Sequence, residues 1–154
     1  MVSQSIGVRV ILLPASYGWA DLSFNDGRDE RRISCSNIVD TLGDLIRGLS
    51  ATDSTHEKQE IWATDESRHE ALISIRRVGK SLEVIAKRRL LSGRKRVWKT
   101  LFRVRGFAVR AVFATALRDA IRLLGAENYR EHWGHPLPVG EFNNILAFCS
   151  EGEN

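Results

Sequence analysis

The stretch between His69 and Arg105 constrains the fold more than any other part of the sequence. It divides into three segments in which apolar and polar residues alternate, and glycine-containing breaks at Gly79 and at 92–95 separate these segments. Alternation with a period of two is typical of strands with one buried and one solvated face, and glycine favours hairpin turns. The sequence therefore predicts an antiparallel meander with strands at Ala71–Val78, Lys80–Leu90 and Val97–Arg105.

The alternation places apolar side chains on one face of this meander and cations on the other. The predicted buried set is Ala71, Ile73, Ile75, Leu82, Val84, Ala86, Trp98, Phe102 and Val104. The predicted exposed cations are Arg76, Lys87, Arg89, Lys99, Arg103 and Arg105. Ile85, Val97 and Leu101 fall on the cationic side, where either packing at a sheet edge or a contact surface would account for them.

The remaining segments extend this plan to an α+β fold. Further strands are expected at 7–13, 19–24, 31–34 and 59–64, and helices at 36–49, 107–124 and 141–149. Ser34 or Ser36 is the expected N-cap of the first helix. We expect a mostly antiparallel sheet of five to seven strands, with the two main helices packed on one face and a short C-terminal helix.

Length and composition fit one domain over residues 1–154. A chain of 154 residues with 43% hydrophobic content can bury a core without a metal or a disulfide. Cys35 and Cys149 lie far apart in the sequence and could pair only if the fold brings them together, so two reduced thiols in a cytoplasmic protein are expected. No apolar run approaches the roughly 18 residues of a membrane span, and the N-terminus lacks the basic start of a signal peptide.

Charge is strongly segregated along the chain, although the net charge is only +4. Residues 76–122 contain fifteen Lys or Arg and two acidic residues, which gives this block a net charge of +13. Residues 1–75 carry −5 and residues 123–154 carry −4. A charge distribution of this kind favours oriented docking onto an acidic partner through long-range steering.

Three patterns that resemble catalytic or metal sites lack the context that such sites need. Gly79-Lys80-Ser81 has no second glycine five positions earlier, and a strand rather than a helix is expected after it, so a P-loop is excluded. The pair His132 and His135 is interrupted by a glycine and followed by a proline, and no cluster of Cys or carboxylate residues completes a ligand set. His56, His69, Asp65, Glu66 and Glu70 lie in turns or at strand ends, where solvated charges are common. We therefore expect no enzyme, no metal and no cofactor.

The basic face of the meander is the strongest functional candidate. It can be a solvated face that keeps edge strands soluble, or a docking surface for an acidic partner. Nucleic-acid binding predicts exposed aromatic rings among the cations. Since the alternation places Trp98 and Phe102 on the apolar side, docking of a protein is favoured over docking of RNA or DNA.

The order of elements resembles a known class of bacterial proteins. A helix over Leu42–Leu49, a strand containing Trp62, the meander and a long apolar helix are followed by Tyr129, Trp133 and Pro136-Leu137-Pro138. This order is similar to that of the small α+β immunity proteins that are encoded beside polymorphic or contact-dependent toxins.

The resemblance implies a cytoplasmic, non-enzymatic protein that binds one cognate toxin domain and blocks its active site or substrate groove. Inhibitors of nuclease toxins commonly present acidic surfaces, whereas the largest charge block of this chain is basic. Either the toxin is not a typical nuclease, or an acidic set forms the contact. That set is Asp53, Glu57, Glu60, Asp65, Glu66 and Glu70.

Overall fold

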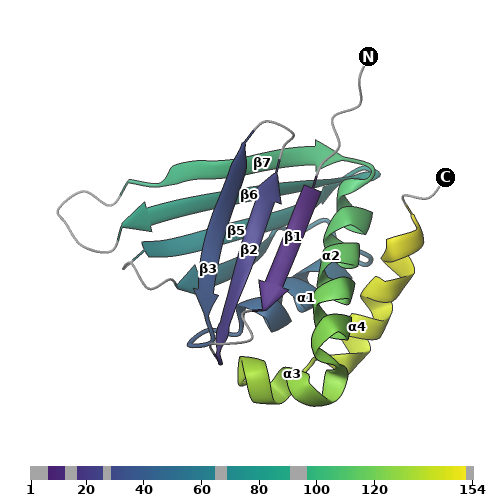
Figure 1. Cartoon of the computed structure of the whole chain (residues 1–154). Coiled ribbons are helices and arrows are strands. Elements are labelled where there is room, and N and C mark those ends of the chain that lie inside the picture. Colours follow the sequence, from purple (N-terminus) through teal and green to yellow (C-terminus); the bar gives the residue numbers. More distant parts are fainter. Residues whose placement is uncertain (1–6, 13–16, 26–28, 65–68, 91–96, 152–154) are drawn as a thin grey trace.

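The computed structural model describes residues 7–12, 17–25, 29–64, 69–90 and 97–151. The elements in these segments follow one another in a simple order along the chain (Figure 1). The strands are β1 (Gly7–Leu12), β2 (Trp19–Asn25), β3 (Glu30–Ser36), β4 (Gln59–Thr64), β5 (His69–Val78), β6 (Ser81–Leu90) and β7 (Lys99–Gly106). The helices are α1 (Thr41–Ala51), α2 (Val109–Leu124), α3 (Ala126–Trp133), α4 (Val139–Leu146) and the 3-10 helix η1 (Ala147–Ser150).

The strands form two antiparallel sheets, β1-β2-β3 and β4-β5-β6-β7, which cross one another (Figure 1). The α+β class and the antiparallel pairing are confirmed, but the expectation of one sheet was wrong. Each sheet has an apolar face, and the two faces cover each other. The ring centroid of Phe24 in β2 lies 4.9 Å from that of Phe102 in β7. The strands therefore bury their apolar side chains between two sheets, where the sequence predicted one extended sheet.

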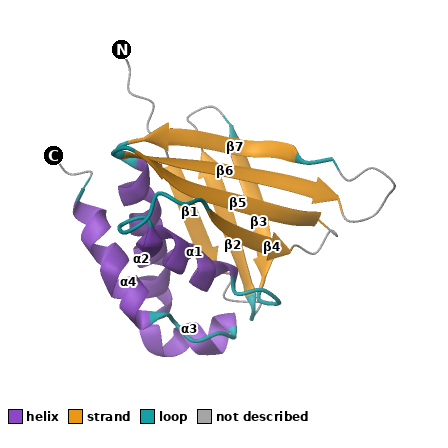
Figure 2. Cartoon of the chain, turned by 180° about the vertical axis from the view of Figure 1, so that it is seen from behind, coloured by secondary structure: helices purple, strands orange, loops and turns teal. Residues whose placement is uncertain are grey.

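The helices pack beside this sandwich as well as on it (Figure 2). α1 contacts β4, and α2 runs along β1 while also touching β6 and β7. The ring centroid of Phe113 in α2 lies 6.3 Å from that of Phe24, which places both in the common core. The buried face of the four-stranded sheet is thus covered by the smaller sheet together with the helices, and not by the helices alone as the sequence predicted.

The first helix begins later than predicted, because its cap is an aspartate. Asp40 is the N-cap of α1, and its Oδ1 accepts from the backbone N–H of Gly43 at 3.0 Å. Ser34 and Ser36 instead belong to β3. A Cβ at position 43 would lie 2.1 Å from Asp40 Oδ2, so glycine is needed for the approach of the capping carboxylate. Ile38 precedes the helix and is 81% exposed.

Helix α3 was not predicted. It lies in the segment between 126 and 140, to which the sequence analysis assigned no helix or strand, and Gly134 ends it in a left-handed conformation. Tyr129 and Trp133, one helical turn apart, are both fully buried. Burial, together with the nearby carboxylate of Asp40, raises the pKa of the Tyr129 phenol, so this side chain stays neutral well above physiological pH.

A partly buried hydrogen bond joins α3 to the start of α1. Trp133 Nε1 donates to Asp40 Oδ1 at 2.7 Å, and the side chain of Trp133 is only 1% exposed. The indole therefore fixes the same carboxylate that caps α1. Residues 93 positions apart in sequence meet at this point.

Replacing this indole tests the link. Trp133→Phe should lower the free energy of unfolding by about 1–3 kcal/mol, because a partly buried, charged acceptor loses its donor. Urea denaturation followed by circular dichroism measures the change. Trp62→Phe is the control, since Trp62 is 37% exposed and its indole donates no hydrogen bond in the described part of the chain. Equal losses in the two variants would show that the Asp40 contact contributes nothing.

The C-terminal region is helical, as predicted, but in two pieces. α4 spans Val139–Leu146 and η1 continues to Ser150, where a single helix over 141–149 was expected. Ile145 and Phe148 provide its buried contacts. Cys35 is buried, whereas Cys149 is partly exposed.

Candidate docking surface on the four-stranded sheet

The predicted alternation of buried and outward residues holds through β5 and most of β6. Ala71, Ile73 and Ile75 are buried, whereas Leu72 and Ser74 between them are partly exposed. In β6 the buried positions are Leu82, Val84 and Ala86. The side of the four-stranded sheet that faces away from the smaller sheet is hereafter called the outer face.

Five of the six predicted cations lie on the outer face by their register. Arg76 and Arg105 both stand beside Glu83, which pairs with them in the β5–β6 and β6–β7 ladders. Arg103 pairs with Ile85, Lys87 with Leu72, and Arg89 with Glu70.

The sixth cation, Lys99, is displaced from this set. A register shift between Ala86 and Lys87 makes Lys99 the partner of Arg88. Arg88 belongs to the opposite face, because its Nη2 donates to the backbone oxygen of Arg32 in the smaller sheet at 2.7 Å. Since directly paired residues share a face, Lys99 is separated from the other five cations.

The same irregularity moves Trp98 to the outer face, where the sequence had placed it in the core. β7 begins only at Lys99, and Trp98 precedes the strand. Its ring centroid lies 6.0 Å from that of Trp62, which stands opposite Leu72 on the outer face. Phe102, by contrast, is buried as predicted.

An arginine binds these two rings together. The Cζ atom of Arg89 lies 4.5 Å from the ring centroid of Trp98 and 6.0 Å from that of Trp62. Its Nη2 donates to Glu70 Oε1 at 2.8 Å. Cation–π contact and a charge-assisted hydrogen bond therefore hold one guanidinium in place. We call Trp62, Glu70, Arg89 and Trp98 the aromatic–arginine cluster.

A shallow hollow lies beside this cluster on the outer face. It has a volume of about 200 Å³. Its lining contains four cations and a single carboxylate, so its field is positive. The lining residues are Lys58, Ser74, Arg76, Glu83, Ile85, Lys87 and Arg103.

Some cations of the outer face form ion pairs with carboxylates, and others do not. Arg76 pairs with Glu83 at 3.1 Å, and Lys58 pairs with Glu60 at 3.1 Å. No carboxylate of the described segments lies within ion-pair distance of Lys87, Arg103 or Arg105. All three are exposed. The positive field is therefore strongest on the β6–β7 side of the sheet.

The acidic residues considered as an alternative contact do not gather into one surface of their own. Glu60 and Glu70 lie on the outer face beside cations. Asp53 lies in the loop after α1, 3.8 Å from Arg110, and Glu57 is exposed further along that loop. Asp65 and Glu66 lie outside the described residues.

The glycine–lysine–serine motif and the two histidines near the C-terminus have structural roles. Gly79, at φ 61°, forms the turn between β5 and β6, so Gly79-Lys80-Ser81 links two strands and does not start a helix. The ring of His132 stacks on Tyr17 at 4.7 Å, and His135 Nε2 contacts the backbone oxygen of Asn37 at 2.6 Å. No group of His, Cys, Asp and Glu that could hold a metal occurs within the described segments.

Comparisons with known proteins give no match for this chain. No protein-family model matches it, and neither a curated protein sequence nor a solved structure does so. Among the described residues, no helix is long and apolar enough to cross a membrane.

Proposed function

We propose that this chain is a non-enzymatic, immunity-type protein of the cytoplasm that binds an acidic surface of a cognate toxin domain through its outer face. The observation that carries the proposal is the aromatic–arginine cluster beside a hollow rimmed by cations. Tryptophan and arginine are the side chains most enriched among residues that dominate binding energy at protein interfaces.

The outer face combines the features of a protein-binding site. The half-buried Leu72 and Ile85 supply apolar area between the charged positions. Trp62 and Trp98 are held in a fixed arrangement by Arg89, so little side-chain entropy is lost when a partner packs on them. The hollow beside them accommodates a carboxylate from the partner.

Charge segregation supports an acidic partner. The block 76–122 carries a net charge of +13 and supplies β6, β7 and the last three residues of β5. Such a field orients a partner before contact and raises the association rate at low ionic strength. In an immunity protein, this would favour rapid capture of a toxin domain whose exposed surface is acidic near its active site.

Single-stranded RNA or DNA is the second candidate, and it gains support from the position of Trp98. Cations interleaved with exposed rings are the usual platform for stacked bases. Two features favour a protein instead. Glu60, Glu70 and Glu83 lie on the same face and would repel a phosphate backbone, and the guanidinium of Arg89 occupies space over both rings.

The proposal is tested through the gene next to the one that encodes this chain, which we expect to encode a toxin domain. Cells that express the toxin domain should survive when this protein is co-expressed, and the two proteins should co-purify as a complex. Absence of protection and of a complex would overturn the proposal.

A parallel titration with single-stranded polynucleotides at low salt decides between the two classes of partner. Nucleic-acid binding would appear as an affinity that falls steeply with salt, because each phosphate contact releases a counterion. We expect no such steep dependence. Tight polynucleotide binding without any toxin complex would establish the second candidate in place of the first.

A further inference from the structure

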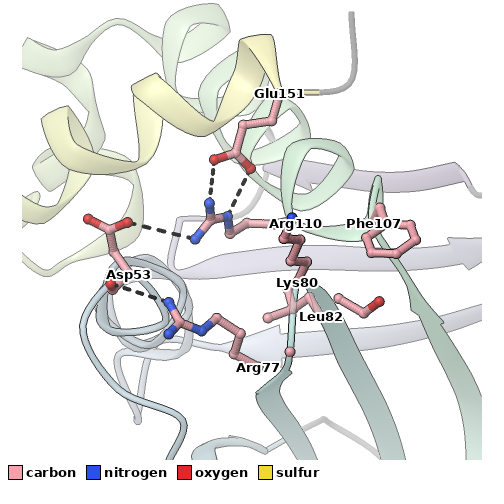
Figure 3. Close-up of a pocket in the computed structure, with 9 residues that line it drawn as sticks. Asp53, Arg77, Lys80, Leu82, Phe107, Arg110 and Glu151 are labelled. Atoms are coloured by element: carbon pink, nitrogen blue, oxygen red, sulfur yellow. Dashed lines mark hydrogen bonds and ion pairs between the residues drawn. The ribbon is translucent and has the colours of Figure 1, made fainter. Parts of the chain in front are cut away.

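A second cavity opens away from the outer face, where the β5–β6 turn meets the start of α2 and the end of the described chain (Figure 3). Its volume of about 360 Å³ lies at the lower end of small-molecule sites, which span roughly 300–1,000 Å³. None of its lining residues belongs to the hollow or to the aromatic–arginine cluster. They are Asp53, Arg77, Gly79, Lys80, Ser81, Leu82, Phe107, Arg110 and Glu151.

Both carboxylates of this cavity are engaged by one arginine. Arg110 binds Glu151 through two parallel N–H···O bonds, with Nε to Oε2 at 2.9 Å. Its Nη1 lies 3.8 Å from Asp53 Oδ1. The Cζ atom rests 4.0 Å from the ring centroid of Phe148, so packing fixes the guanidinium plane. The negative charge of the cavity is therefore concentrated around Arg110.

The other two cations of the cavity, Arg77 and Lys80, form no ion pair with a carboxylate of the described segments. Arg77 Nη1 donates to the backbone oxygens of Thr52 at 3.0 Å and of Asp53 at 3.4 Å, and its Nη2 contacts His56 Nε2 at 2.6 Å. Lys80 is exposed in the β5–β6 turn and forms no ion pair with any carboxylate in the described segments. Two positive charges thus face this cavity uncompensated, which favours an anionic ligand.

The rim of the cavity also carries an exposed aromatic ring. Phe107 stands between β7 and α2 and is 75% exposed, and Figure 3 shows its ring beside the cavity. Leu82 beneath is only 2% exposed. A flat apolar group can stack on the Phe107 ring and remove it from water. A cation and a ring at the two sides of one opening together select a ligand with an anionic group and a ring.

We propose that this cavity binds a small organic anion, with a phosphate or carboxylate group against Lys80 and a flat ring against Phe107. Arg77 adds a second positive charge to the cavity, while Glu151 limits the affinity by repelling the anion. This site is separate from the outer face and is independent of the function proposed for it.

Three probes separate the contributions of the anion and the ring. Inorganic phosphate, phenyl phosphate and benzoate are each titrated into the full chain, and the backbone amides of Gly79 and Ser81 are followed by NMR. Phenyl phosphate should bind more tightly than inorganic phosphate, with a dissociation constant of about 1 mM or lower. Comparison of phenyl phosphate with benzoate shows which anionic group the site prefers.

Variants assign these effects to residues. Lys80→Gln should weaken phenyl phosphate binding about tenfold, whereas Arg122→Gln, which removes one exposed positive charge elsewhere on α2, should leave it unchanged. Phe107→Ala should abolish the preference for phenyl phosphate over inorganic phosphate. Glu151→Gln should tighten binding severalfold, because one negative charge leaves the cavity.

Two results would overturn the proposal. One is an absence of amide shifts with all three probes at about 10 mM, well above the expected dissociation constant. The other is an equal effect of Lys80→Gln and Arg122→Gln, which would show that only the overall charge of the protein attracts the anion. Neither result would bear on the docking function proposed for the outer face.

Discussion

Replacing Phe24 by alanine should lower the free energy of unfolding by about 3–5 kcal/mol. The side chain of Phe24 is only 1% exposed. Its ring contacts Phe102 of the larger sheet and Phe113 of α2, with centroids 4.9 Å and 6.3 Å away. Truncation therefore opens a cavity where both sheets and the longest helix meet, and the surrounding side chains cannot close it without moving all three elements.

Such a loss is a large part of the total stability of a domain, which is typically about 5–15 kcal/mol. Urea denaturation of the unaltered protein and of Phe24→Ala measures this loss directly. Phe107→Ala is the matched control, because Phe107 is 75% exposed and should change the stability by about 0.5 kcal/mol or less. A Phe24→Ala loss as small as that of the control would mean that the two sheets do not share a core.

The second large effect is expected on partner binding. The double variant Lys87→Glu/Arg103→Glu should weaken the complex with the cognate toxin domain at least about a hundredfold, which is about 2.7 kcal/mol. Both side chains line the hollow of the outer face, and neither has a carboxylate partner among the described residues. Charge reversal therefore replaces attraction of an acidic partner by repulsion, and no internal ion pair is broken.

The control reverses the same number of charges away from the outer face. Arg122→Glu/Arg130→Glu changes the net charge equally, at exposed positions on α2 and α3. Titration calorimetry at two salt concentrations compares the variants, because long-range attraction is screened by salt and direct contacts much less so. Similar losses in both double variants would contradict docking through the outer face and leave only a general attraction between opposite charges.

Local patterns predicted the elements of this fold well. The alternation in 71–86 correctly divided buried from outward residues, since a strand turns its side chains to opposite faces at each residue. The apolar stripe of 107–124 predicted α2, which spans Val109–Leu124. Five of the six cations proposed for the binding surface lie together on the outer face, because their positions follow from strand parity.

The errors came from features that depend on distant partners. The register shift after Ala86 carries Trp98 outward and Lys99 away from the other cations, and no local pattern indicates it. Helix α3 is only eight residues long, and its buried residues Tyr129 and Trp133 are stabilised by the core and by Asp40. The spacing of these two aromatic residues by four was the one signal that could have revealed the helix.

The sequence by itself determined the class of the fold, the parity of the central strands and the segregation of charge, because each of these depends on residues close together in the chain. The tertiary structure decided that the strands divide into two crossed sheets, that Trp62, Arg89 and Trp98 form one cluster, and that Arg110 and Glu151 border a cavity with Lys80. These arrangements follow from burying two apolar sheet faces against each other. That requirement couples residues far apart in the sequence, so no short segment contains the information.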